Sequence, residues 1–196
     1  MSLLSVYRDM SVHAKSSCEN PVLVGPMTFH FDGKLTHIYA SSRQLMMFCV
    51  SGDGNCLFQA ISVCLYGVED YHLLLRTLTA VEVLSHSDWY DISAMNCKNP
   101  LLAVPEILLP TYDVVCKKVG CLGSSCGMGT ILALSAAVGV PVCTFWPPVT
   151  GSIDQNAMCR LVVGHDLDPA VVRAVCVMWS SSGAVPQQAV FVMCRD

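Results

Sequence analysis

Apolar positions in the middle of the chain recur at the spacing of a helix. After residue 55, apolar side chains return every three or four positions, which is the period of one buried helical face. They are Leu57, Ala60, Ile61, Cys64 and Leu65. Gly67 follows at a position suited to a helix C-cap. The pattern therefore predicts a helix that begins near Cys56 and ends before Gly67.

Three further helices are predicted downstream. Residues 71–85 read as a long helix, and one side of it collects most of its apolar side chains. These are Leu74, Leu75, Leu78, Val81 and Leu84. Residues 112–120 predict another helix, and residues 128–138 predict a short helix that is apolar on nearly all sides.

Strand patterns precede and follow these helices. Residues 26–31 and 35–40 alternate around Asp32-Gly33, which is a strong hairpin turn signal. Residues 45–50 predict a short extended or helical piece. Four later segments are apolar and short enough for strands: residues 140–146, 160–163, 175–179 and 189–194. Helices that flank a central mixed sheet give an α/β (α+β) domain.

The segment before the first helix carries the strongest chemical signal. Gly52 and Gly54 can adopt positive φ, and Asp53 and Asn55 are favourable helix N-cap residues. Cys56 would then lie in the first helical turn, where the helix dipole favours the reactive thiolate. Free backbone N–H groups of this loop could receive an oxyanion. The alternative interpretation is a buried, inert cysteine, which is a common core residue.

The composition of the chain indicates one globular domain and disfavours membrane and nucleic-acid-binding proteins. The chain has 196 residues, of which 53% are hydrophobic and 13% are charged, so one domain with a substantial core is expected. No apolar run is long enough to predict a membrane span, and the first nine residues lack a signal-peptide core. We therefore expect a cytoplasmic protein without a membrane partner. The net charge of −4 and the scattered basic residues disfavour nucleic-acid binding.

Twelve cysteines raise the question of disulfides or metal. There is no Cys-x-x-Cys, and Cys116, Cys121 and Cys126 recur every five residues, which is not a usual zinc-finger spacing. Most of the others lie in apolar runs and are expected to be free thiols in a reducing compartment. We therefore expect no cofactor and no metal, with a structural zinc at these three cysteines as the open alternative.

The nucleophile segment resembles a known family. Asp53-Gly54-Asn55-Cys56-Leu57-Phe58, followed by Gln59-Ala60-Ile61-Ser62, resembles the cysteine motif of ovarian-tumour (OTU) proteases, and the chain also resembles vertnin-like OTU relatives. The resemblance implies a papain-like domain over residues 21–196, after an amino-terminal segment of residues 1–20. It implies a thiol protease that cleaves isopeptide bonds after the terminal glycine of ubiquitin, with ubiquitin or polyubiquitin as partner. A viral origin would place it in the host cell.

OTU proteases pair the nucleophilic cysteine with a histidine as general base, and for this histidine the chain departs from the family pattern. OTU proteases carry it at the start of the last strand, where this chain has Gln188. The hairpin of residues 26–40 resembles that strand but precedes the cysteine, as in a permuted order. His37 is therefore the first candidate for the general base, with His30 and His165 as alternatives. Asp53 is included as a candidate third member, although it is equally suited to shaping the loop.

Two other functions stay open. Gln188 favours a catalytically inactive OTU-like domain that binds ubiquitin or acts as a scaffold, because glutamine cannot accept and return a proton. The retained Cys56 favours the enzyme. A papain-like hydrolase that acts on a different modifier is the third class.

Overall fold

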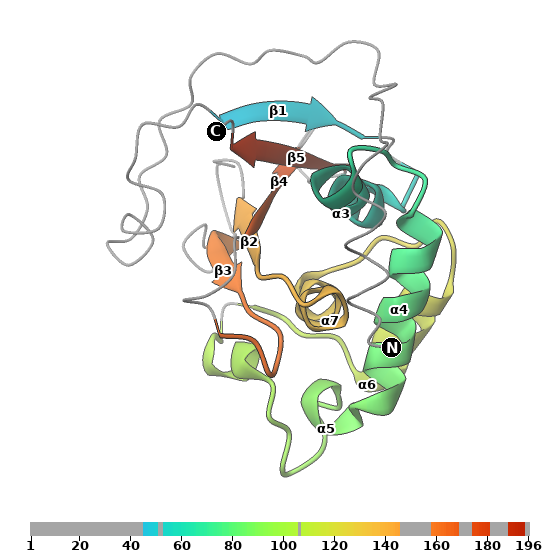
Figure 1. Ribbon diagram of the computed structural model, residues 1–196. Coiled ribbons are helices and arrows are strands. Elements are labelled where there is room, and N and C mark those ends of the chain that lie inside the picture. Colours follow the sequence, from blue (N-terminus) through green and yellow to red (C-terminus); the bar gives the residue numbers. More distant parts are fainter. Residues whose placement is uncertain are drawn as a thin grey trace.

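A computed structural model describes residues 45–50, 53–105, 107–145, 158–168, 174–180 and 188–194 (Figure 1). The predicted amino-terminal segment and the predicted hairpin of residues 26–40 lie outside the described residues.

The described strands form one sheet in the order β1-β5-β4-β2-β3. Their bounds are β1 Leu45–Cys49, β2 Val142–Phe145, β3 Arg160–Val162, β4 Val175–Ser180 and β5 Gln188–Cys194. β2 and β4 run parallel, and the other neighbouring pairs are antiparallel. The expected mixed sheet is therefore confirmed, and residues 45–50 resolve as a strand rather than a helix.

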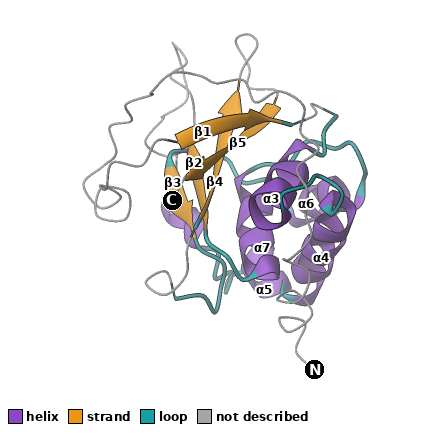
Figure 2. Ribbon diagram, turned by 45° about the horizontal axis from the view of Figure 1, so that its top comes forward, coloured by secondary structure: helices purple, strands orange, loops and turns teal. Residues whose placement is uncertain are grey.

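The described helices lie together on one side of this sheet (Figure 2). Their bounds are α3 Cys56–Tyr66, α4 His72–Ser85, α5 Ser87–Tyr90, α6 Tyr112–Gly120 and α7 Met128–Val138, with a short 3-10 helix at Pro100–Ala103. The predictions for residues 112–120 and 128–138 match α6 and α7 at both ends. The expected arrangement of helices that flank a central mixed sheet is therefore confirmed. No described helix has the length and apolar character needed to span a membrane.

Helix α3 lies between the sheet and the other helices. It contacts β4 and β5 on one side and α4 on the other. All seven residues from Cys56 to Ser62 are buried, so the first two turns are enclosed on every side. Cys64 and Leu65, which the periodicity places on the buried face, are only partly buried. Gly67 ends the helix with φ +78°, as predicted for a C-cap.

Helix α4 has the predicted bounds but buries a different face from the predicted one. Its buried residues are Leu75, Arg76, Thr79, Glu82 and Val83. Three members of the predicted face are exposed: Leu74 by 44%, Val81 by 55% and Leu84 by 65%. The prediction of that face is wrong because the buried side carries Arg76 and Glu82, which a count of apolar side chains assigns to solvent.

The corrected face can be tested by two matched substitutions in α4. Leu75→Ala should lower the free energy of unfolding by about 2–5 kcal/mol, because it leaves a cavity at a fully buried side chain. Leu84→Ala, at an exposed position of the same helix, should change it by less than about 0.5 kcal/mol. Urea denaturation followed by circular dichroism measures both. Equal effects of the two substitutions would contradict the observed face.

Candidate functional site

Cys56 is the first residue of α3, and Asn55 stands at the N-cap position before it. The prediction that Cys56 lies in the first helical turn is therefore confirmed. Its side chain is 5% exposed and belongs to the edge of the core. The first turn of α3 begins at Cys56, so the positive end of the helix dipole lies at this thiol, although the Phe58 N–H already donates to the Asn55 carbonyl oxygen at 2.9 Å.

Asp53 shapes the loop ahead of the nucleophile. Its Oδ1 accepts the Asn55 backbone N–H at 2.8 Å, and its Oδ2 accepts Gln59 Nε2 at 3.3 Å. Burial raises the pKa of Asp53, but the hydrogen bonds from Asn55 and Gln59 outweigh it and hold the pKa below its ordinary value. Both carboxylate oxygens are thus used within the loop. The Asn55 N–H is also taken, so in this arrangement it is not available to an oxyanion.

The loop is pressed against a second loop that follows α6. Asparagine is a residue type that favours capping by its side chain, but Asn55 makes no such cap on α3. Its Oδ1 instead accepts the Gly123 N–H at 3.1 Å. Gly54 has φ +82°, and a Cβ there would lie 1.9 Å from the Gly123 carbonyl oxygen. Glycine is therefore required at position 54 both by its backbone conformation and by this close approach.

Arg76 of α4 connects these two loops by hydrogen bonds to both of them. Its side chain is 3% exposed, and its guanidinium lies 4.5 Å from the centroid of the Phe58 ring in α3. Its two terminal nitrogens donate to five backbone carbonyls. Nη1 donates to Lys118, Val119 and Cys121 at 2.8, 3.2 and 2.7 Å, and Nη2 donates to Gly54 and Ser124 at 3.0 Å each. Two of these carbonyls belong to the last turn of α6, where helices lack internal donors.

The sequence analysis missed Arg76 as a residue of this site. A signal existed, because Arg76 interrupts an apolar run from Leu73 to Leu78 at a helical position next to Leu75. Such an arginine is rarely buried unless its donors are satisfied. One of the five acceptors, however, lies 22 positions away in the sequence and the other four lie 42 to 48 positions away, so no local pattern marks them.

Among the described residues, the three cysteines in and just after α6 are not arranged as a metal site. Cys116, Cys121 and Cys126 are free thiols and do not form a metal-ligand group among the described residues. Cys126 lies close to the nucleophile loop, and its Sγ contacts the Ser124 carbonyl oxygen at 3.6 Å. Burial raises the pKa of the Cys126 thiol, and Cys56 adds to that rise. The cysteine zinc alternative is therefore not supported within the described residues.

The structure places only some of the predicted histidines. His30, His37 and also Gly52 lie outside the described residues, so their roles stay predictions. Gln188 is the first residue of β5 and pairs with Ser180. The strand that Gln188 begins, β5, contacts the nucleophile helix α3.

His165 lies at a different place from Cys56. Its Nε2 contacts Glu82 Oε1 at 2.5 Å, and its Nδ1 contacts Asp166 Oδ2 at 3.1 Å. Glu82 is six residues beyond Arg76 in α4, which is about 9 Å along the helix axis. Burial lowers the pKa of His165, but its hydrogen bonds to Glu82 and Asp166 outweigh it and raise the pKa above its ordinary value. With both nitrogens directed at carboxylates, the structure does not bring His165 to Cys56.

Replacement of Arg76 tests its role in joining the loops. Arg76→Met should lower the free energy of unfolding by about 3 kcal/mol or more, because five acceptors lose a donor at about 0.5–1.5 kcal/mol each. The Gly123 amide should also exchange its hydrogen faster in the variant. Lys98→Met is the control, since it removes an exposed ion pair to Asp88 and should leave the free energy of unfolding nearly unchanged. Wild-type stability of Arg76→Met would contradict this role.

Comparison with known proteins gives the same family as the nucleophile segment. Residues 48–119 match the family described as Vertnin, OTU domain. No curated protein sequence matches the chain at a significant level. The structure of the OTUD1 OTU domain is similar with a TM-score of 0.51 and 17% identity, covering 82% of this chain and 90% of that one.

Two viral structures are also similar. The OTU protease of Qalyub virus has a TM-score of 0.49 and 14% identity, covering 77% of this chain and 85% of that one. The Hazara virus OTU domain, solved bound to ubiquitin, has the same TM-score of 0.49 and 14% identity, covering 78% of this chain and 82% of that one. The segment around Cys56 thus matches a family model of OTU domains, and the fold of the described residues is similar to that of an OTU domain.

Proposed function

We propose that this OTU domain is a thiol-dependent deubiquitinase with Cys56 as its nucleophile, acting in the cytoplasm on ubiquitin or polyubiquitin. The observation that carries the proposal is the position of Cys56 at the first residue of α3, behind a loop that Arg76 and Gly123 hold in place. A fixed loop and a helix N-terminus are the arrangement that activates a thiol and receives an oxyanion. Ubiquitin as substrate rests on the resemblance to OTU proteases.

The proposed reaction is acyl transfer through a thioester. The Cys56 thiolate attacks the carbonyl of the terminal glycine of ubiquitin and forms a tetrahedral oxyanion. The Asn55 N–H already donates to Asp53, and the Phe58 N–H donates to the Asn55 carbonyl oxygen. We therefore assign oxyanion stabilisation to the N–H groups of Cys56 and Leu57. The intermediate then expels the lysine amine, which takes a proton from the general acid. Water, activated by the same group as base, hydrolyses the thioester and frees the thiol.

We assign the general base to His37, with His30 as the alternative. Both belong to the predicted hairpin of residues 26–40, which resembles the histidine strand of OTU proteases in permuted order. His165 is not retained for this role, since Glu82 and Asp166 occupy its two ring nitrogens. Asp53 supports the reaction by holding the loop and is not assigned to orient the imidazole.

A ubiquitin probe with a carboxyl-terminal electrophile tests the nucleophile. We expect one adduct on the wild-type chain and none on Cys56→Ala. Cys121→Ala is the matched control, because it removes an exposed thiol and should label like wild type. His37→Ala should slow the cleavage of diubiquitin by more than about a hundredfold, the usual contribution of a general acid–base. An unlabelled wild-type chain that is folded by circular dichroism would overturn the enzyme proposal.

An inactive, ubiquitin-binding OTU domain is the second candidate. Gln188 favours it, because it opens the strand that lies against the nucleophile helix, at the place where OTU proteases carry their histidine. The low exposure of Cys56 also fits a thiol that no longer reacts. Binding of ubiquitin without cleavage would support this candidate.

The substitution Gln188→His separates the two candidates. If His37 is the base, the site is already complete, and we expect the rate of diubiquitin cleavage to change by less than about threefold. If the base has been lost, a histidine at the start of β5 should raise the rate by more than about a hundredfold. Gln187→His, one position earlier, is the control. A large activation by Gln188→His but not by Gln187→His would overturn the assignment of His37.

A further inference from the structure

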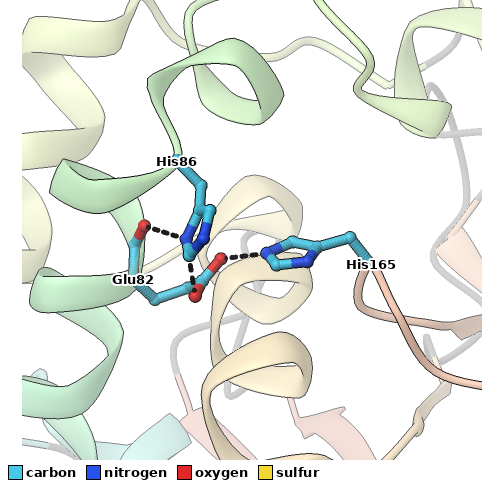
Figure 3. A group of neighbouring side chains, drawn as sticks. All are labelled: Glu82, His86 and His165. Carbon is cyan, nitrogen blue, oxygen red and sulfur yellow. Dashed lines mark hydrogen bonds and ion pairs between the residues drawn. The ribbon is translucent and has the colours of Figure 1, made fainter.

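Three side chains gather at the far end of α4 from the nucleophile loop. Glu82 and His86 lie near the end of the helix, four residues apart and thus on one face, and His165 lies in the loop after β3. Figure 3 shows the three side chains directed toward one another. Each offers one ligand atom, and these atoms all lie within 4.8 Å of one another. Among the described residues, this is the only such group of histidine, cysteine or acidic side chains.

The carboxylate of Glu82 is the centre of the cluster. Its Oε1 lies 2.5 Å from His165 Nε2, and its Oε2 lies 3.0 Å from His86 Nδ1. The two imidazole rings are themselves neighbours, with centroids 4.6 Å apart. One carboxylate thus faces two imidazoles from two distant parts of the chain.

A surrounding set of contacts fixes these groups in orientation. The Tyr90 hydroxyl donates to Glu82 Oε1 at 2.7 Å, and the Asp166 carboxylate holds His165 Nδ1, so that Nε2 points to the cluster. The Trp89 ring stacks on His165 with centroids 5.0 Å apart. A carboxylate on the far nitrogen of a histidine is the usual support of a metal-bound imidazole.

The backbone next to His165 is held as well. The Gly164 N–H donates to Ser135 Oγ of α7 at 3.0 Å. A Cβ on Gly164 would lie 2.3 Å from the backbone nitrogen of Ala136, so the loop is pressed onto α7. The backbone that carries His165 is therefore fixed next to α4, so the entropy cost of ordering this residue when a ligand binds is small.

We propose that Glu82, His86 and His165 form a zinc-binding site, separate from Cys56 and unrelated to the cleavage reaction. Two imidazoles and one carboxylate are a ligand set that suits Zn²⁺, whereas Mg²⁺ and Ca²⁺ prefer oxygen ligands only. Glu82 and Asp166 supply two negative charges, which a divalent cation would balance. Ligand atoms in a tetrahedral zinc site are about 3.4 Å apart, so small side-chain rotations bring these three into range.

The exposure of the cluster leaves one side open. The side chain of His86 is 44% exposed, while those of Glu82 and His165 are 10% exposed. A metal can therefore reach the site past His86, and water can complete the coordination as a fourth ligand. Bound zinc would connect the loop after the sheet's edge strand β3 to the end of α4, and so would stabilise the folded chain by linkage.

Metal titration of the purified full chain, stripped with a chelator, tests the proposal. We expect one equivalent of Zn²⁺ by isothermal titration calorimetry and a rise in melting temperature upon addition of Zn²⁺. Co²⁺ should give visible d–d bands without the thiolate-to-cobalt charge-transfer band, because the ligands are nitrogen and oxygen. His86→Ala and Glu82→Gln should each weaken Zn²⁺ binding by more than about a hundredfold, which exceeds the usual effect of a supporting residue.

Controls distinguish this site from the many thiols and from the nucleophile. His72→Ala removes another histidine of α4, whose Nδ1 contacts the Glu69 carbonyl oxygen, and should bind Zn²⁺ like wild type. Cys56→Ala should also bind normally, so the result does not depend on protease activity. His86 is partly exposed, and an unchanged melting temperature of His86→Ala without metal would show that this variant is folded. No binding, a thiolate band, or wild-type affinity in His86→Ala would each overturn the proposal and leave a cluster held by hydrogen bonds alone.

Discussion

The buried guanidinium of Arg76 is the interaction on which the nucleophile end of the molecule depends. Taking a cation out of water is costly unless its donors are satisfied. Here five backbone carbonyls accept hydrogen bonds from the two terminal nitrogens, while Nε has no partner among the described residues. Those carbonyls come from the loop before α3, the end of α6 and the loop after it. One side chain thus joins three segments that are distant in sequence, and the Phe58 ring covers its face.

Helix α4 connects two parts of the molecule with different chemistry. Its first half carries Arg76, which positions the loop of the nucleophile. Its last turn carries Glu82, which contacts both His165 and His86, the C-cap residue that follows the helix. The polar residues Arg76 and Glu82 are buried, whereas the apolar residue Leu84 is exposed to solvent. The helix is therefore organised by its buried polar partners as much as by apolar packing.

Much of the fold follows from local patterns. Gly67 and Gly139 end α3 and α7 in left-handed conformations, and apolar runs bounded by turn residues give the strands, so these elements were predictable. The position of Cys56 also followed from its own neighbours. Three features could not be predicted in this way: the inward face of α4, the partner of the Asn55 side chain and the position of His165. Each of them depends on a residue more than forty positions away in the sequence. The periodicity of apolar residues does not predict which charged side chains are buried, because their partners are distant in the sequence.

The contact between Gly54 and Gly123 couples two positions that are far apart along the chain. Gly123 has φ +72°, and a Cβ there would lie 3.3 Å from the Asp53 carbonyl oxygen, while a Cβ on Gly54 would meet the Gly123 carbonyl group. Neither position can gain a side chain unless the other loop moves, and that loop is anchored by Arg76. The requirement for glycine at position 54 therefore depends on the backbone path of the loop that contains Gly123, and the reverse holds for position 123. Insertions or deletions between α6 and α7 would reach the nucleophile through this contact, although they fall nearly seventy residues after it.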